Sequence, residues 1–399
     1  MTDGGERAGT GGAATARPRP LGTRREAFEL PDDVAYFNTA NLAPQLRAVR
    51  EAGERALDRR AAPWEIESDD WFTEVEVLRD LAAQVMGADA DGVALVPASS
   101  YGIAVAARNL PVEAGRRILV LAGEYPSGIY TWRAVCRRTG AEILTVSREP
   151  GQAWADAVRA QIDDRVAIVS VPNVHWTDGS WVDLDAVADA ARRVGAALVI
   201  DASQSLGAVP MDVARLRPDF LVSGGYKWLL GPFSVGYLYV AERHRDGVPL
   251  EENWIVRAGS EDFARLLDYR DEYQPGARRF DVGQRTNFTL TPMAIAALTQ
   301  VLEWGVPRIA ASLELVTERL AAEAGALGLT PLPAALRGPH VLGISLPEPA
   351  LAAVGGVLAG ARCYAGVRGS SLRLAPHLFT TGRDIERLFG ALARVPGVA

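Results

Sequence analysis

The chain has 399 residues, 48% of them hydrophobic, so it is long enough to bury a large core and to form two or three domains. Its net charge is −7 with mixed signs and no run of like charge, which argues against nucleic acid and anionic membranes as partners. Two cysteines (Cys136 and Cys363) and four scattered histidines offer neither a disulfide framework nor metal-ligand spacing, so we expect no metal site.

Residues 1–30 are predicted to be a flexible N-terminal tail, because the first 25 are rich in Gly, Ala, Thr, Pro and Arg and contain no apolar stretch. Arg24 and Arg25 form a twin arginine, but the residues after them are too polar for the core of a signal peptide. No segment reaches the roughly 18–20 continuous apolar residues that a membrane helix needs. We therefore expect a soluble, cytoplasmic protein.

Short apolar and β-branched runs alternate with amphipathic stretches through the middle of the chain. The expected strands are 92–98, 117–123, 141–147, 166–172, 197–203, 220–225 and 236–241. The expected helices are 44–60, 71–87, 127–140, 152–162 and 183–195. This alternation predicts an α/β fold with a buried, largely parallel seven-stranded sheet. The run 236–241 follows 220–225 too closely for a crossover helix, so we expect that last strand to be antiparallel.

The C-terminal hundred residues alternate again, after two helices predicted at 291–305 and 307–328. Strand-like runs at 340–347, 364–369 and 371–376 surround a helix near 348–360, and a final helix begins near Arg383. The pattern predicts a small α/β layer separate from the main sheet.

Polar residues at the carboxyl ends of the predicted strands deserve most scrutiny, because ligands bind beyond those ends in open α/β sheets. They are Ser99, Ser100, Glu124, Tyr125, Asn173, the segment 201–204 and the segment 223–227.

Lys227 is the only lysine among the 42 lysine and arginine residues of the chain. Arginine can carry charge at almost any site, but its guanidinium stays protonated and does not readily form an imine. A desolvated lysine amine loses its proton more easily and can attack an aldehyde, so Schiff-base chemistry requires lysine. The alternative is that Lys227 is an exposed lysine without a catalytic role, retained by chance.

Asp201 ends a predicted strand made almost wholly of apolar residues, and Lys227 follows the next strand at the same sheet edge. Burying a carboxylate there is costly unless a cation meets it, although a helix cap or a core ion pair would serve equally well. An Asp that faces a pyridinium nitrogen, with a Lys that holds an aldehyde, is the arrangement that pyridoxal phosphate requires. The pair therefore predicts this cofactor.

Seven segments in order strengthen the prediction. They are YFNTANLAP (36–44), PASSYG (97–102), GEYPSGIYTW (123–132), VPNVHWTDG (171–179), IDASQSLGAVPMDV (200–213), SGGYKWLLGP (223–232) and LRLAPHLFTTGRDI (372–385). Together they make the chain resemble the class V aminotransferase-fold enzymes, a group with cysteine desulfurases, kynureninases and isopenicillin-N-epimerase-like proteins. The resemblance covers roughly residues 34–394. It implies the pyridoxal-phosphate fold type I. The large cofactor-binding domain would comprise residues 31–290 and the small C-terminal domain residues 291–399. The N-terminal segment would contribute to the small domain.

The resemblance implies roles around the cofactor ring. Lys227 would form the Schiff base and later move a proton, and Asp201 would pair with the ring nitrogen. Gln204 would reach the ring hydroxyl with Asn173 beside it, and Tyr125 would stack on the ring face.

Further residues are implied for the phosphate. Ser99 and Ser100 open a helix, whose first amides favour an anion, and Ser223 and Tyr226 would add donors. The stretch 283–288 resembles a family loop that touches the phosphate of a partner subunit, with Gln284, Arg285 and Thr286 as alternatives for the contact. A homodimer with shared sites follows from this resemblance.

Arg373 matches the family arginine that binds the substrate α-carboxylate, where a bidentate guanidinium fixes orientation as well as charge. A surface arginine on a strand is the alternative in so arginine-rich a chain. Asn41, in the first of the quoted segments, is a further candidate for the substrate pocket.

Two departures from the family narrow the reaction. Desulfurases need a nucleophilic cysteine on a mobile loop, whereas Cys363 lies in a predicted strand, where a thiol is usually inert, and Cys136 lies in a predicted helix. Tyr125 stands where desulfurases have histidine, which favours the kynureninase-like and epimerase-like branches. The phosphate loop reads Gly283-Gln284-Arg285 rather than Gly-Thr.

The sequence therefore predicts a pyridoxal-phosphate enzyme that acts on an α-amino acid, favoured as a lyase that alters a C–S or C–C bond. An aminotransferase and an amino-acid epimerase of the same fold are alternatives, and a non-catalytic sensor or scaffold is an alternative of another class. The substrate and the bond that breaks are left open by the sequence.

Overall fold

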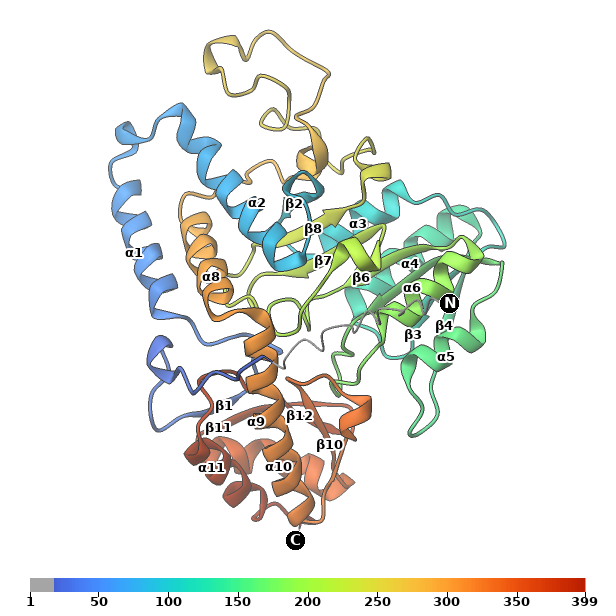
Figure 1. Cartoon of the computed structure of the whole chain (residues 1–399), viewed down its shortest axis with the longest axis vertical. Coiled ribbons are helices and arrows are strands. Elements are labelled where there is room, and N and C mark those ends of the chain that lie inside the picture. Colours follow the sequence, from blue (N-terminus) through green and yellow to red (C-terminus); the bar gives the residue numbers. More distant parts are fainter. Residues whose placement is uncertain (1–17, 399) are drawn as a thin grey trace, which may run out of the picture.

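The computed structural model describes residues 18–398, which contain a seven-stranded and a five-stranded β-sheet flanked by helices (Figure 1). The larger sheet has the order β2-β8-β7-β6-β5-β3-β4. Its strands are β2 Val93–Val96, β3 Arg117–Leu121, β4 Glu142–Val146, β5 Val166–Pro172, β6 Ala197–Asp201, β7 Phe220–Gly224 and β8 Gly236–Val240. The predicted strand order along the chain is confirmed. Pairing from β4 through β7 is parallel, and β8 runs antiparallel to both of its neighbours, because the short segment after β7 holds no crossover helix.

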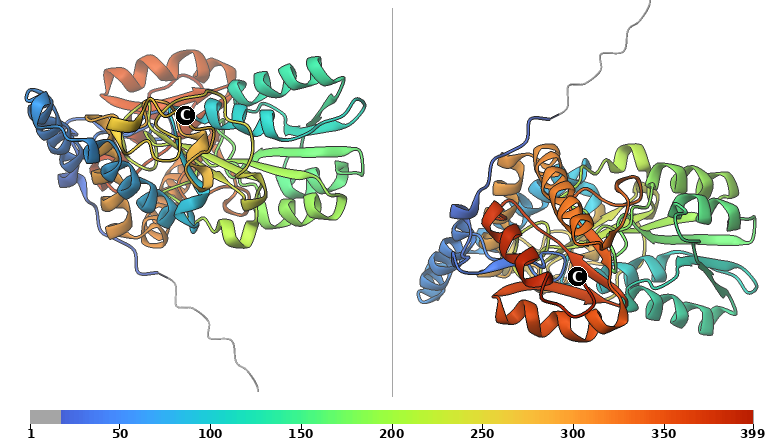
Figure 2. Two further views of the ribbon diagram at one scale, coloured as in Figure 1. Left: turned by 90° about the horizontal axis from the view of Figure 1, so that it is seen from above. Right: turned by 90° about the horizontal axis from the view of Figure 1, so that it is seen from below.

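Helices cover both faces of this sheet (Figure 2). They are α3 Ser99–Asn109, α4 Pro126–Thr139, α5 Trp154–Gln161, α6 Leu184–Val194 and the short α7 Val213–Leu216. The side chains of β3 alternate between two apolar clusters. Ile118 packs with Trp132 of α4, whereas Leu119 packs with Val158 of α5 and Val187 of α6. Successive side chains of a strand point to opposite faces, so a strand covered on both sides is apolar throughout.

Three further helices pack together beside the sheet (Figure 1). They are α1 Arg47–Arg60, α2 Thr73–Met86 and α8 Leu290–Trp304. Leu78 of α2 and Ala294 and Val301 of α8 belong to the same apolar cluster as Leu119 of the sheet. The core of the large sheet therefore extends to a helix that lies C-terminal to residue 290.

The second sheet has the order β1-β11-β12-β10-β9. Its strands are β1 Ala35–Phe37, β9 Thr330–Pro331, β10 Leu342–Ser345, β11 Cys363–Arg368 and β12 Ser371–Leu374, and its helices are α10 Glu348–Gly360 and α11 Gly382–Leu392. The helix α9 (Val306–Ala326) joins the two cores, because Ile309 packs in the first and Leu320 in the second. The domain boundary at 290/291 stays a prediction.

The N-terminal segment contributes β1, which pairs in parallel with β11. Residues 1–17 of the predicted tail lie outside the described residues. Residues 18–30 contact the folded chain: Arg25 forms an ion pair with Asp384 of α11 (2.9 Å), and Phe28 is fully buried. Residues 18–30 are therefore packed rather than flexible, because the aromatic side chain of Phe28 is buried in the hydrophobic core.

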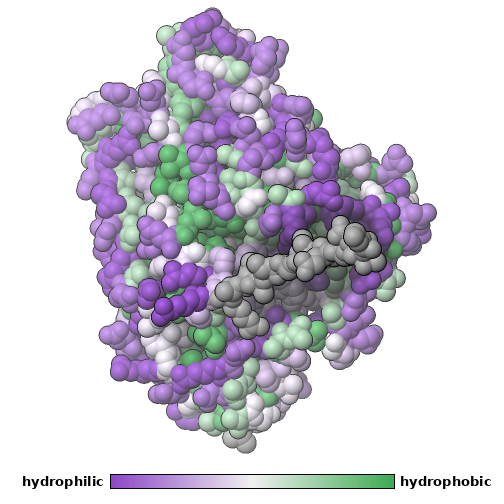
Figure 3. Space-filling model, in the orientation of Figure 1, coloured by the Kyte–Doolittle hydropathy of each residue, from purple (hydrophilic) through white to green (hydrophobic). Residues whose placement is uncertain are grey.

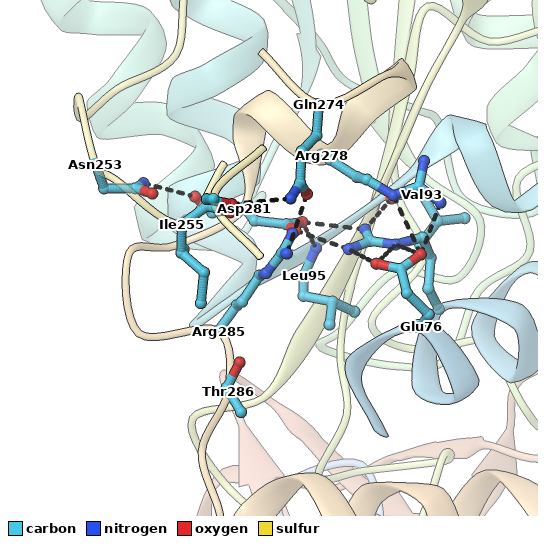
Figure 4. Close-up of polar contacts among 12 residues, drawn as sticks. Glu76, Val93, Leu95, Asn253, Ile255, Gln274, Arg278, Asp281, Arg285 and Thr286 are labelled. Carbon is cyan, nitrogen blue, oxygen red and sulfur yellow. Dashed lines mark hydrogen bonds and ion pairs between the residues drawn. The ribbon is translucent and has the colours of Figure 1, made fainter. Parts of the chain in front are cut away.

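A long irregular excursion, drawn in gold in Figure 1, connects β8 to α8. Buried charges tie its end to α2 and β2 (Figure 4). The carboxylate of Asp281 accepts from Arg79 (2.7 Å), from Arg285 (2.6 Å) and from the amide of Leu95 (2.7 Å). Burial opposes the charge on Arg79, but Asp281 and Glu76 outweigh it and hold the pKa of the guanidinium above its usual value. Removing one partner from such a network leaves an uncompensated buried charge.

Short 3-10 helices occur at Arg25–Ala27, Pro63–Glu65, Ser68–Trp71, Ala90–Gly92, Glu242–His244, Phe263–Arg265, Gly276–Phe280 and Ala334–Leu336. On the face drawn in Figure 3, hydrophilic residues predominate and apolar residues form small groups among them. Among the described residues, every helix is too short or too polar to cross a lipid bilayer.

Candidate active site

A cavity of about 390 Å³ opens where the strands of the large sheet end. Its walls come from segments that are far apart in the chain but adjacent at this sheet edge, as the strand-end prediction requires. The lining includes Ser99, Ser100, Glu124, Tyr125, Pro172, Val174, Trp176, Asp201, Ser203, Gln204, Gly224, Tyr226 and Lys227.

Lys227 follows the end of β7, and its Nζ lies 5.8 Å from the ring centroid of Tyr125 and 5.5 Å from that of Tyr226. Burial lowers the pKa of the amine to about 8. The negative charge of Asp201 raises this pKa, and the positive charges of Arg373 and Arg368 lower it further. Lys227 takes part in no ion pair within residues 18–398. At pH 7 about one amine in ten is therefore neutral and able to attack a carbonyl carbon.

Two carboxylates lie at the cavity with Lys227. The Oδ1 atom of Asp201 accepts from the amide of Ser203 at 2.9 Å. Burial raises the pKa of Glu124 to about 8; the amide of Tyr125 lowers it, and the charge of Asp201 raises it further. The cavity therefore contains one acid that is largely protonated at neutral pH.

The start of α3 forms another part of the cavity wall. No side chain caps this helix, so its first amides remain available to an anion. The Ser99 and Ser203 hydroxyls lie 2.7 Å apart, and the amide of Gly224 donates to Ser203 at 3.3 Å. The helix lies unusually close to β7, since a Cβ at Gly102 would come within 2.5 Å of Val222. This close approach gathers hydroxyls and amides at one end of the cavity.

Gln204 and Asn173 already have hydrogen-bond partners in the protein. Gln204 lines the cavity, but its Nε2 donates to the carbonyl oxygen of Ala40 (2.9 Å) and its Oε1 accepts from Trp228 (3.1 Å). Asn173 is buried and donates to the carbonyl oxygen of Val182 (3.1 Å), and its neighbours Pro172 and Val174 line the cavity in its place. The predicted contact of Gln204 with a ring hydroxyl would use its remaining N–H.

Arg373 lies on β12 beside the cavity and is 1% exposed. Its guanidinium donates to the carbonyl oxygen of Trp176 and, at 3.4 Å, to Oδ1 of Asn38. Asn41 is exposed and does not line the cavity; its amide closes a turn on Asn38. The asparagine that contacts Arg373 is therefore Asn38, three residues before the one that we predicted for the substrate pocket.

Four other candidates for cofactor contacts do not line this cavity. Ser223 is buried and donates to the carbonyl oxygen of Gly224 (3.2 Å). Gln284 is exposed, and Thr286 donates to the carbonyl oxygen of Trp71. Arg285 is held inside by Asp281 and by Gln274. The contact of Gln284 or Thr286 with a partner subunit's phosphate stays a prediction.

Neither cysteine lines the cavity. Cys363 is 1% exposed within β11, as the strand prediction expects, and Cys136 lies in α4. Burial raises the pKa of both thiols, so little thiolate forms at neutral pH. In the part of the chain that the structure describes, no group of His, Cys, Asp and Glu side chains is arranged to hold a metal ion.

Several residues of the site were given no specific role from the sequence. Ser203 stands in a quoted segment, and Glu124 was noted as a strand-end residue, but nothing local signals its raised pKa. Trp176 and Arg368 lie on separate segments, and the Arg368 guanidinium carbon sits 5.8 Å from the Trp176 ring centroid. Only the assembled fold brings them together.

Comparison with known proteins identifies relatives. The family model "Aminotransferase class-V" matches residues 66–333. The uncharacterized aminotransferase YcbU of Bacillus subtilis is 28% identical over 80% of this chain and 83% of its own length. Isopenicillin N epimerase of Streptomyces clavuligerus is 27% identical over 92% of this chain and 96% of its own. A structure of a C-DES variant with glycine linked to the PLP cofactor has a TM-score of 0.85 at 18% identity, covering 93% of this chain and 99% of that one. The predicted fold type I is confirmed.

Proposed function

The chain belongs to the class-V aminotransferase family, whose cofactor is pyridoxal 5'-phosphate, and from this premise we propose that it is a lyase that cleaves a C–S or C–C bond in the side chain of an α-amino acid. The observation that carries the proposal is the buried amine of Lys227, unpaired within the described residues, in one cavity with Asp201.

The residues of the cavity fit the cofactor. Lys227 would hold its aldehyde carbon, Asp201 its ring nitrogen, and the face of Tyr125 its ring. The uncapped start of α3, with the hydroxyls of Ser99 and Ser203, would hold its phosphate. A volume of about 390 Å³ suits a ligand of this size.

The bound cofactor accepts the electron pair that is released at the substrate α-carbon. Arg373 binds the α-carboxylate through the N–H groups that Trp176 and Asn38 leave free, and this fixes the orientation of the α-carbon. Lys227, once displaced, removes the α-proton as a general base, for which a pKa of about 8 is well matched.

Two features of the cavity support a lyase. Neither cysteine lines it, so the bond breaks without a persulfide on the enzyme. Glu124, with a pKa of about 8, can donate a proton to a departing group at neutral pH. An aminotransferase is the second candidate, because YcbU carries that description. An epimerase is the third, because isopenicillin N epimerase aligns over nearly the whole chain.

Product analysis tests the proposal. We would incubate the holoenzyme with α-amino acids that carry β- or γ-substituents, without an added oxo acid, and follow ammonia and oxo-acid formation. C–S cleavage by elimination yields both together with the released thiol, whereas C–C cleavage yields a shorter amino acid together with the released fragment and no ammonia. Product only in the presence of an added oxo acid would establish the aminotransferase instead, and inversion of the α-carbon without fragmentation the epimerase. No conversion of any kind would favour the non-catalytic scaffold.

The lowered pKa of Lys227 makes a prediction for the cofactor-free protein. The rate of imine formation with pyridoxal phosphate should rise with pH and level off above about 8, because the amine is then deprotonated. Stopped-flow absorbance between pH 6.5 and 9.5 measures this rate. Free Nα-acetyl-lysine, with its ordinary pKa near 10.4, serves as the control and should show no plateau in that range. A rate for the protein that climbs like the control would contradict a desolvated amine.

We also propose that the protein is a cytoplasmic homodimer in which Gln284 or Thr286 contacts the partner's phosphate. Support comes from the apolar side chains exposed on the nearby excursion, of which Leu267 (83%) and Tyr269 (91%) are the most exposed. Exposed apolar groups of this size commonly mark contact surfaces.

A further inference from the structure

Two arginines lie on neighbouring strands beside the cavity. Arg368 ends β11 and Arg373 lies on β12; the strands form an antiparallel hairpin in which Arg368 pairs with Ser371, and Gly366 with Arg373. The hairpin is short, so both guanidiniums come from one rigid element.

Both arginines contact Trp176, which lines the cavity. Arg373 donates to the carbonyl oxygen of Trp176, and the Arg368 guanidinium carbon lies 5.8 Å from its ring centroid, within cation–π range. The edge of Tyr125 meets the same indole, with ring centroids 5.5 Å apart. Two positive charges therefore lie behind Trp176 in the cavity wall, close enough to lower the pKa of Lys227.

No carboxylate of the described residues compensates either charge. Within residues 18–398, Arg368 and Arg373 form no ion pair with a carboxylate, and Arg368 donates only to the carbonyl oxygen of its neighbour Val367. The buried Nε of Arg373 has no hydrogen-bond partner. Burial lowers the pKa of Arg373 to about 10, and the charge of Arg368 lowers it further.

An anion would stabilise this arrangement, because Arg373 is a buried cation and Arg368 a half-buried one, and neither has an ion-pair partner among the described residues. The cavity's own carboxylates do not pair with them: among the described residues, Glu124 accepts from the amide of Tyr125 and Asp201 from the amide of Ser203. A single α-carboxylate occupies one guanidinium fork, so a substrate with only that group would leave the second cation unpaired.

We propose that the substrate carries a second anionic group in its side chain, which Arg368 binds while Arg373 binds the α-carboxylate. This rests on the proposed function, because it assigns the substrate class of the same site. Trp176 keeps the two guanidiniums apart, because Arg373 donates to its carbonyl oxygen and Arg368 lies over its ring. The two anionic groups of the substrate would therefore bind at separate points. The class comprises amino acids with a distal carboxylate or a comparable acid.

Binding of amino acids that carry no leaving group in the side chain tests the inference, with the holoenzyme as the protein. The probes are two matched pairs, L-glutamate with L-glutamine and L-aspartate with L-asparagine, and the readout is the dissociation constant from the cofactor absorbance. We expect at least one acid to bind about 10-fold or more tightly than its amide, as for other charge-assisted contacts. Arg368→Gln should abolish this preference and leave the amide's affinity within about 2-fold, while Arg368→Lys should retain part of it.

Arg362 provides the matched control. It lies just before β11, is exposed, and pairs with Asp33 far from the cavity, so Arg362→Gln should leave the preference unchanged. Equal affinity for acid and amide in both wild-type pairs, or an unchanged preference in Arg368→Gln, would overturn the inference. So would the absence of any spectral change with all four amino acids. The lyase proposal is judged separately by its products, because an acid preference without elimination refutes the lyase and retains the anion site.

Discussion

Replacing Lys227 with alanine is expected to abolish covalent attachment of the cofactor and to lower turnover by about 10⁴-fold. The loss is large because one amine holds the aldehyde and also moves the proton. Arginine cannot substitute for it, since the guanidinium remains protonated. Lys227→Arg should therefore be as inactive as Lys227→Ala, although it retains a positive charge near Asp201.

Borohydride reduction followed by peptide mass analysis measures the attachment. Wild-type protein should carry the reduced cofactor on the peptide that contains residue 227, and both variants should carry none. Circular dichroism and thermal unfolding provide the control for folding. Turnover in Lys227→Ala near the wild-type rate would refute the central role of this residue.

Replacing Asp281 with alanine is expected to cost about 3–5 kcal/mol of stability. The carboxylate pairs with Arg79 and Arg285, which are at most 1% exposed, and accepts the amide of Leu95. Its removal leaves the buried Arg285 without a carboxylate partner and the Leu95 N–H group without an acceptor, and Arg79 retains only Glu76. The effect on the fold should be greatest where the network ties the excursion to α2 and β2.

Urea unfolding of the variant and the wild type measures this loss through the midpoint and slope. Asp268→Ala is the matched control, because Asp268 pairs with Arg265 (3.0 Å) at the surface, where both side chains are more than half exposed. Such a pair contributes less than about 1 kcal/mol. If the two variants were equally stable, the buried network would not be a principal anchor of this region.

Much of the fold was predictable from local patterns. The helix predicted at 183–195 is observed at Leu184–Val194, and the strand predicted at 166–172 is observed with those bounds. Both succeed because periodicity and end signals are local properties: Asp183 caps α6 through its side chain, and Gly195 ends it with a positive φ of 71°. The antiparallel β8 was predictable from the length of one connection.

The candidate site was predictable only in part. Lys227, Asp201 and Tyr125 share one cavity because carboxyl ends of neighbouring parallel strands meet at one edge. Asn41 was expected at the substrate pocket and that role stays a prediction; Asn38 is the asparagine that contacts Arg373, whereas Asn41 is exposed. No pattern in the sequence distinguishes two asparagines three residues apart on an irregular turn.

The sequence alone was enough to assign the cofactor chemistry. It shows a single lysine, an aspartate at the end of a predicted strand and a set of motifs in a fixed order, and none of these depends on the tertiary structure. The largely protonated state of Glu124, the burial of Arg285 against Asp281 and Gln274, and the unpaired cations around Trp176 emerged only once distant segments were packed together. These are properties of burial and of through-space charge, which depend on neighbours contributed by other parts of the chain.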